Sequence, residues 1–143
     1  MSLMLKTVDF TRNEITKRKS FILYSIIGVS GASLDYVVFL LLLKYVPLHY
    51  VLLNVVSTTL GIVNNFIWNA RLNFGVTDQW FTRFLRFYAV GLLGIAVGSV
   101  LLYLAVDCLL LSPAISKLIV IFVIVLLQYN LNKRVSFGKL ADP

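Results

Sequence analysis

Four long apolar runs, separated by short polar segments, constrain the fold of this chain more than any other feature. To within a few residues at each end they cover Phe21–Leu43, Val51–Trp68, Phe87–Val106 and Ser116–Leu131. A hydrocarbon core about 30 Å thick needs roughly 20 helical residues to cross it, which each run nearly supplies. None of the runs shows the period-two alternation of a membrane β-strand. We therefore expect an all-α integral membrane protein with four transmembrane helices.

The composition agrees with a chain whose main solvent is lipid. Hydrophobic residues make up 59% of it and charged residues 13%, with a mean hydropathy of +0.90. A soluble domain carries roughly 45–50% apolar and about 25% charged residues, so this chain cannot cover its whole surface with polar groups. One cysteine, Cys108, and one histidine, His49, give neither an internal disulfide nor a metal cluster. We expect no metal and no cofactor.

Basic residues are distributed asymmetrically around the runs. Eleven of the thirteen fall before the first run, between the second and third, or after the fourth, and only Lys44 and Lys117 fall elsewhere. Because basic residues concentrate in cytoplasmic segments, both chain ends are expected in the cytoplasm. This placement also accounts for the net charge of +7 without a nucleic-acid partner.

The first twenty residues differ from the rest of the chain. They carry Lys17, Arg18, Lys19 and other charges and contain no apolar core, so they do not resemble a secretory signal. We expect residues 1–20 to be retained as a cytoplasmic segment, either lying at the membrane interface or forming a flexible tail. A single transmembrane domain is expected over residues 21–139.

The two halves of the chain match at a fixed offset of 63 residues. Gly28 and Gly31 of the first run correspond to Gly91 and Gly94 of the third. The ends of the second and fourth runs also correspond, with Asn69, Arg71, Phe74 and Gly75 matching Asn132, Arg134, Phe137 and Gly138. This predicts a duplicated helical hairpin, with repeats over 21–75 and 84–138. Each copy crosses twice, so the repeats are expected to be parallel.

Small residues form a stripe on the first and third runs. Gly31 and Asp35 share one face of the first helix, and Gly94 and Gly98 hold the same positions on the third. Such stripes let helices approach closely in lipid, so we expect the first and third helices to contact each other. Asp35 is the one clear break in the symmetry, because its counterpart is Gly98.

Asp35 is a carboxylic acid inside a transmembrane run, which costs at least ~2.5 kcal/mol on insertion scales. It lies about 14 residues, or roughly 20 Å of helix, beyond the cytoplasmic start of its run. Asn54 and Lys117 are expected at a similar depth in the outer half. Two interpretations remain open: a functional acid facing the protein interior, or a buried Asp35–Lys117 pair that only fixes the helix register.

The second and fourth runs also carry polar faces. Asn54, Thr58 and Asn65 fall at i, i+4 and i+11, and Lys117 and Gln128 are eleven residues apart on one face. Amides and hydroxyls suit the hydroxyl groups of a sugar.

A second polar group is expected near the cytoplasm. Asn65, Asn69, Asn132, Arg71 and Arg134 should gather there, and arginine suits phosphate through paired hydrogen bonds. The alternative is that these basic residues serve only topology and interfacial anchoring. No carboxylate pair, nucleophile with a base, or phosphate-binding loop is found, so we do not expect an enzyme.

These residues resemble those of the GtrA-like family of small four-span membrane proteins, over about Phe21–Gly138. The resemblance rests on the Gly-x-x-Gly-x-x-x-Asp pattern that ends in Asp35 and on the two cytoplasmic exits, Asn65–Phe74 and Gln128–Phe137. These exits are similar to the family pattern Asn-Phe…Asn-Arg-x-x-Phe. The chain departs from it at Ala70 and at Gln128-Tyr129.

The resemblance implies translocation of a polyprenyl-phosphate-linked sugar, often glucose, such as undecaprenyl phosphate glucose, across the bacterial cytoplasmic (inner) membrane. The sugar would then serve cell-surface polysaccharide or teichoic-acid glycosylation, with a membrane glycosyltransferase as the usual partner. The expected substrate-binding residues are Asp35, Asn54, Asn65, Asn69, Arg71, Lys117, Gln128, Asn132 and Arg134. Two other functions stay open: a scaffold that recruits or stabilises the glycosyltransferase, and a small proton-coupled efflux transporter. Because a chain of this size has few helices with which to enclose a transport path, a homodimer is also expected.

Overall fold

The computed structural model describes residues 2–135 and, within that range, the side chains of residues 8–128. Its four helices are α1 (Ser2–Tyr45), α2 (Tyr50–Trp68), α3 (Trp80–Tyr103) and α4 (Pro113–Val135). α2 continues into a π-helical segment η1 (Asn69–Asn73), and α3 into a second one, η2 (Leu104–Cys108). The all-α fold predicted from the apolar runs is confirmed, with four helices in the described residues.

Local sequence explains where the helices begin and end. α1 stops shortly before Pro47, because a proline disfavours helical backbone at the residue preceding it. His49 caps α2 by accepting a hydrogen bond from the Val51 N–H at 3.3 Å. α4 begins with Pro113 at its first helical position, where the missing N–H costs nothing. Gly75, with φ of +56°, turns the chain after η1.

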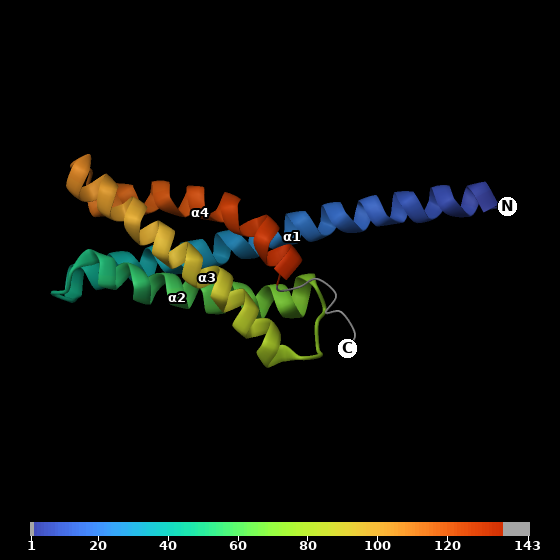
Figure 1. Ribbon diagram of the computed structural model, residues 1–143, viewed down its shortest axis with the longest axis horizontal. Helices are drawn as coiled ribbons and strands as arrows, with labels where there is room; N and C mark the ends of the chain where they lie inside the picture. The colour runs from blue at the N-terminus through green and yellow to red at the C-terminus, as the bar shows by residue number, and fades with distance from the viewer. Residues whose placement is uncertain (1, 136–143) are drawn as a thin grey trace.

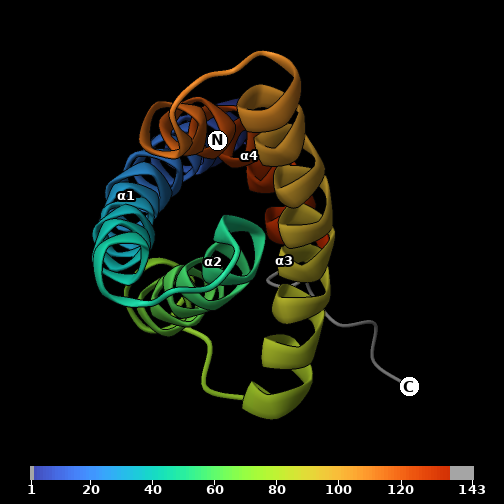
Figure 2. The same cartoon turned by 90° about the vertical axis from the view of Figure 1, so that its left-hand side faces the viewer.

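The helices surround a common centre, with α4 lying between α1 and α3 (Figure 2). α3 crosses α2 obliquely when the bundle is viewed from the side (Figure 1). We call the end of the bundle near Phe21 and η1 the basic end. The opposite end, with the α1–α2 turn and the α3–α4 connection, is the far end.

α1 is much longer than the first apolar run. Its first part extends out of the bundle as a straight helix (Figure 1). The segment before Phe21, expected as an interfacial segment or a flexible tail, is therefore helical from Ser2 and continuous with α1. Asn73 in η1 donates a hydrogen bond at 3.1 Å to the Ser20 carbonyl, which ties η1 to α1 at the point where α1 enters the bundle.

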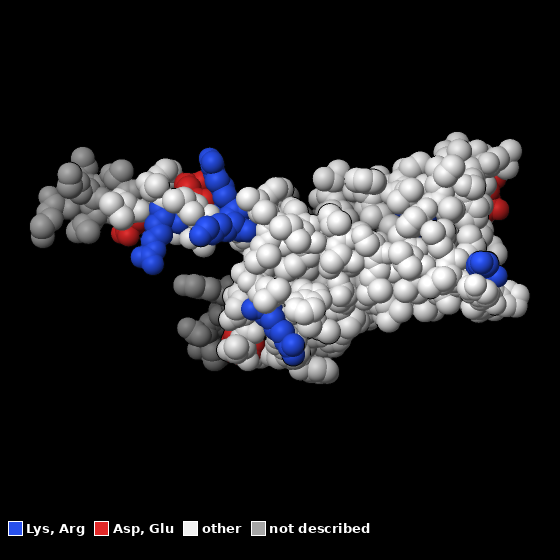
Figure 3. Space-filling model, turned by 180° about the vertical axis from the view of Figure 1, so that it is seen from behind, with Lys and Arg blue, Asp and Glu red and all other residues white. Residues whose placement is uncertain are grey.

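Three helical stretches are long and apolar enough to cross a membrane: Val8–Tyr45, Tyr50–Asn73 and Trp80–Cys108. The apolar stretch of α4 within the described residues, Pro113–Gln128, is shorter than the roughly 18 residues that usually mark a span. Charged side chains on the face seen in Figure 3 lie near the two ends of the bundle and along the projecting part of α1. The surface between the ends is almost free of charge there, as expected for a lipid-facing protein.

The glycine stripes of α1 and α3 do not face each other, so the expected contact between the first and third helices is wrong. Gly31 instead faces the side chain of Asn65 on α2, and Gly94 faces that of Gln128 on α4. The α1 stripe therefore packs against α2, and the α3 stripe against both α2, through Gly91, and α4. The physical reason is that Gly31 and Gly94 each make room for an amide side chain of a neighbouring helix.

Two apolar clusters form the interior. The cluster toward the far end contains Phe39, Leu53, Leu102, Val120 and Ile124. The cluster toward the basic end contains Ile62, Phe66, Ala70, Phe87 and Ile95. Along α2, the polar residues Asn54 and Thr58 come between the members of these clusters, so polar groups occupy the middle of the bundle.

Trp80, Phe84 and Phe87 lie on one face of α3. That face packs on Phe66 of α2, with ring centroids 5.0, 5.1 and 5.5 Å away. The cluster fixes the start of α3 against the end of α2.

Candidate functional site

The middle of the bundle contains a buried ion pair. The Lys117 ammonium on α4 lies 2.8 Å from an Asp35 carboxylate oxygen on α1, with the two side chains 1% and 7% exposed. The predicted similar depth of these two residues is therefore confirmed. The Lys117 ammonium also lies 5.4 Å from the centre of the Phe39 ring, which adds a favourable cation–π contact.

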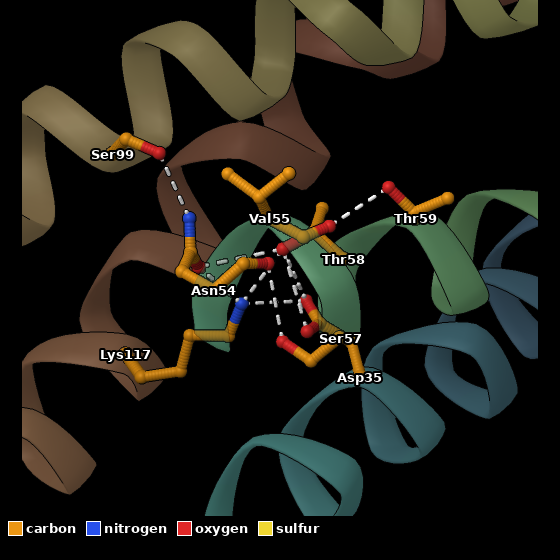
Figure 4. A network of polar contacts seen from close by, with 8 residues as sticks. All are labelled: Asp35, Asn54, Val55, Ser57, Thr58, Thr59, Ser99 and Lys117. Atoms are coloured by element: carbon orange, nitrogen blue, oxygen red, sulfur yellow. Dashed lines mark hydrogen bonds and ion pairs between the residues drawn. The ribbon is translucent and has the colours of Figure 1, made fainter. Parts of the chain in front are cut away.

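Polar groups from α2 and α3 complete the network around this pair (Figure 4). Lys117 donates hydrogen bonds to the Asn54 side-chain oxygen at 2.6 Å and to the Thr58 hydroxyl at 2.9 Å. The Thr58 hydroxyl lies 3.3 Å from Asp35, and the Asn54 amide donates to Ser99 on α3 at 3.0 Å. All four helices thus contribute a side chain to one network.

This network explains how two charges are tolerated inside the bundle. Three oxygen-bearing side chains surround the Lys117 ammonium, so its hydrogen-bonding capacity is used. Removing one partner of a buried ion pair typically costs about 3–5 kcal/mol, because the other charge is left uncompensated. Asp35 and Lys117 are therefore expected to depend strongly on each other.

A cavity of about 60 Å³ adjoins the network and extends from it toward the basic end. Asp35, Asn54, Thr58 and Lys117 line one part of it, and Asn65 and Gln128 line another. Its volume is well below the roughly 300 Å³ of a small-molecule pocket, although it exceeds the roughly 15 Å³ that one water needs. In this conformation the cavity can hold water but not a sugar.

Two amide atoms in the cavity wall have unused hydrogen-bonding capacity. The Asn65 side-chain oxygen and the Gln128 side-chain nitrogen are buried and have no hydrogen-bond partner among the described residues. Both side chains are only partly buried as a whole. Because a buried polar atom without a partner costs about 1–3 kcal/mol, an acceptor and a donor here are ready for water or a ligand hydroxyl.

The basic end carries a separate hollow of about 380 Å³, lined by Arg71, Gly75, Val76, Thr77 and Trp80. The Arg71 guanidinium lies 6.0 Å from the Trp80 ring and is exposed, so its hydrogen-bond donors can reach an anion. The structure thus places Arg71 apart from Asp35, whereas Asn65, which was expected near Arg71, lines the cavity of Asp35.

Asn69 does not line either hollow. It is 1% exposed, and its amide donates to the Asn65 carbonyl at 3.0 Å while its side-chain oxygen accepts from Asn73 at 3.1 Å. These bonds hold the turn into η1, which is a structural role. The predicted residues Asn132 and Arg134 lie outside the residues whose side chains the structure describes.

Thr58 and Ser99 belong to the network but were not among the predicted site residues. Thr58 could have been found, because it lies one turn from Asn54 on the polar face of the second run. Ser99 is a single hydroxyl in an apolar helix, and nothing in the sequence distinguishes it from a serine that bonds to its own backbone.

Comparison with known families agrees with this arrangement. The model of the GtrA/DPMS transmembrane domain family matches residues 23–137, which include α1 from residue 23 on, the other three helices and the whole buried network. Comparisons with curated proteins and with solved structures gave no significant match. The matched range covers most of the chain, and the apolar helices agree with the family's place in the membrane. The chain is therefore a multi-pass membrane protein of the GtrA/DPMS transmembrane domain family.

Proposed function

We propose that this chain translocates a polyprenyl-phosphate-linked sugar from the cytoplasmic to the outer leaflet of the bacterial cytoplasmic membrane. Family membership implies a role in glycosylation that uses polyprenyl-linked sugars. The observation that carries the proposal is the polar cavity inside an otherwise apolar bundle. A lipid carrier can keep its chain in the bilayer, so only the sugar and phosphate need such a polar path.

The proposed path has two binding regions. Arg71, in the hollow at the basic end, receives the phosphate together with Arg134 and Asn132 of the second repeat. The unpartnered amides of Asn65 and Gln128 then bond sugar hydroxyls on the way to Asn54 and the Asp35–Lys117 pair. As the sugar moves along these residues, each of its hydroxyl groups exchanges one hydrogen-bond partner for another, which keeps the free-energy cost of each step small.

Translocation requires the bundle to open, because the cavity is too small for a sugar. The seam between α1 and α4 is the natural place, since these two helices pack less extensively than the other neighbouring pairs. The Asp35–Lys117 ion pair joins them across this seam. A sugar hydroxyl that bonds Asp35 would weaken the ion pair and so favour separation of the two helices.

We further propose that the two hairpins, residues 21–75 and 84–138, are parallel repeats with both chain ends in the cytoplasm. Two matching contacts support the duplication. Asn65 faces Gly31 in the first hairpin, and Gln128 faces Gly94 in the second, so that each member of the first pair lies 63 residues before its counterpart in the second. The placement of basic residues supports the orientation.

Two other functions make different predictions. A proton-coupled efflux transporter needs an acid that exchanges a proton for a cationic substrate, whereas Asp35 already has Lys117 as its cationic partner. A scaffold for a glycosyltransferase would need no internal path. Leaflet exchange of a labelled polyprenyl-phosphate sugar, in vesicles that contain only this chain, separates translocation from scaffolding.

A further inference from the structure

A second, larger hollow lies on the outside of the bundle. It is a groove of about 520 Å³ between α1 and α4, and most of its lining is apolar. Its lining includes Phe21, Val29 and Tyr36 of α1, and Leu118, Phe122 and Leu126 of α4. From Phe21 to Tyr36 the groove follows roughly 22 Å of helix, which is most of the thickness of a hydrocarbon core.

The basic end of this groove is positively charged. Arg18 and Lys19 are exposed on α1 within about one turn of Phe21, where the groove begins, as is Lys17, which pairs with Glu14 at 3.0 Å. The groove therefore combines an apolar channel along the membrane with cations at its cytoplasmic mouth. This combination is complementary to a lipid with one long apolar chain and an anionic phosphate head.

The groove and the polar cavity are neighbours that share part of their lining. Gly28 and Ala32 of α1 and Ile121 and Val125 of α4 line both. A Cβ added at Gly28 would meet no atom within 4 Å. At Gly31, one turn later, an added Cβ would clash with the Asn65 side-chain oxygen. Gly28 thus leaves open space in the wall between groove and cavity.

We propose that the α1–α4 groove binds the isoprenoid chain of the carrier lipid. The open space at Gly28 then lets the lipid chain in the groove stay joined to its head group while the sugar crosses the cavity. This inference rests on the proposed function and adds to it a binding site for the apolar part of the substrate. It also explains why the polar cavity borders the α1–α4 seam, which opens directly to lipid.

Photo-crosslinking of the full chain in vesicles tests the groove, with a polyprenyl phosphate that carries a diazirine in its chain as the probe. We expect cross-links on the α1 and α4 groove residues, and not on the lipid-facing residues Leu93, Val97 and Val100 of α3. Excess polyprenyl phosphate should compete, whereas excess phosphatidylglycerol should not. Equal labelling of α3 or equal competition by phosphatidylglycerol would overturn the inference.

Two matched tryptophan variants sharpen this test. Val29→Trp fills the groove, and Val100→Trp adds the same bulk on α3, where the native valines are 66% and 59% exposed. Labelling should fall at least about tenfold in Val29→Trp, because the indole occupies space that the lipid chain would otherwise fill. It should stay within about twofold in Val100→Trp. Equal effects in the two variants would contradict a specific groove.

Gly28→Leu tests the opening. The variant should fold, because the added side chain meets no atom at its Cβ and leucine is a better helix former than glycine. We expect cross-linking in the groove to persist while leaflet exchange falls at least about tenfold. Exchange at the wild-type rate would remove Gly28 from the path.

The outcomes for the groove and for the proposed function are separable. Wild-type exchange without groove labelling would overturn the groove and leave translocation standing. Groove labelling without exchange would leave a lipid-binding site standing and overturn translocation.

Discussion

The Lys117 ammonium on α4 lies 2.8 Å from the Asp35 carboxylate on α1, so one buried ion pair joins the first and last helices of the bundle. These two helices pack less extensively than the other neighbouring pairs. The ion pair therefore sits where the bundle has most freedom to open. It can act in function, in stability or in both, and substitutions separate these roles.

Replacing Asp35 alone with alanine should destabilise the protein by about 3–5 kcal/mol, because Lys117 keeps only neutral partners, Asn54 and Thr58. Thermal unfolding in mild detergent, followed by circular dichroism, measures this. Loss of sugar modification in this variant alone would not prove a functional role, because protein level should fall as well.

The double variant Asp35→Leu with Lys117→Met resolves that ambiguity. Replacing both charges with apolar groups of similar size should recover most of the lost stability. We expect a folded protein that no longer supports sugar modification. Normal modification by the stable double variant would show that the pair only fixes the packing of α1 and α4.

The sequence predicts the polar part of the site better than the packing around it. Asp35 and Lys117 could be paired from the sequence because buried charges require partners, and their depths follow from helix geometry. The glycine stripes could not be assigned in the same way. A glycine on a helix face indicates a close approach, but not whether a backbone or an amide such as that of Asn65 approaches it. The groove also could not be predicted, since its lining is indistinguishable from a lipid-facing surface.

Gly61 on α2 marks the closest approach of α1 and α2. A Cβ there would lie 2.9 Å from the Gly31 carbonyl oxygen and 3.1 Å from the Asp35 Cβ, so a backbone must move. Gly61→Ala should therefore destabilise the bundle by about 1–3 kcal/mol in detergent unfolding. Gly28→Ala is the matched control and should be neutral or slightly stabilising. Equal stability of the two variants would contradict the described packing.

Cys108, the single cysteine, tests the orientation because it is exposed at the far end of the bundle. We expect a membrane-impermeant maleimide to label it in intact cells. In the control, Cys108→Ser combined with Thr77→Cys moves the thiol to the basic end, where labelling should require permeabilised cells. The reverse pattern would place the basic end outside.

Arg71 should contribute to binding of the phosphate. Arg71→Ala is expected to weaken retention of radiolabelled polyprenyl phosphate by about tenfold, with Arg71→Lys in between, because lysine keeps the charge but loses paired hydrogen bonds. Arg86→Ala is the control, since Arg86 is an exposed base near the same end that does not line the Arg71 hollow. An equal loss in the control would indicate general charge attraction instead of a site.

The most direct measurement is leaflet exchange by the purified chain in vesicles. A fluorescent polyprenyl-phosphate sugar is distributed over both leaflets, and a membrane-impermeant reductant then bleaches the outer leaflet. We expect bleaching to continue into the inner-leaflet pool with wild-type protein, and to stop at the outer leaflet with the stable Asp35→Leu, Lys117→Met variant. Bleaching that stops at the outer leaflet with wild-type protein, as in protein-free vesicles, would contradict translocation by this chain.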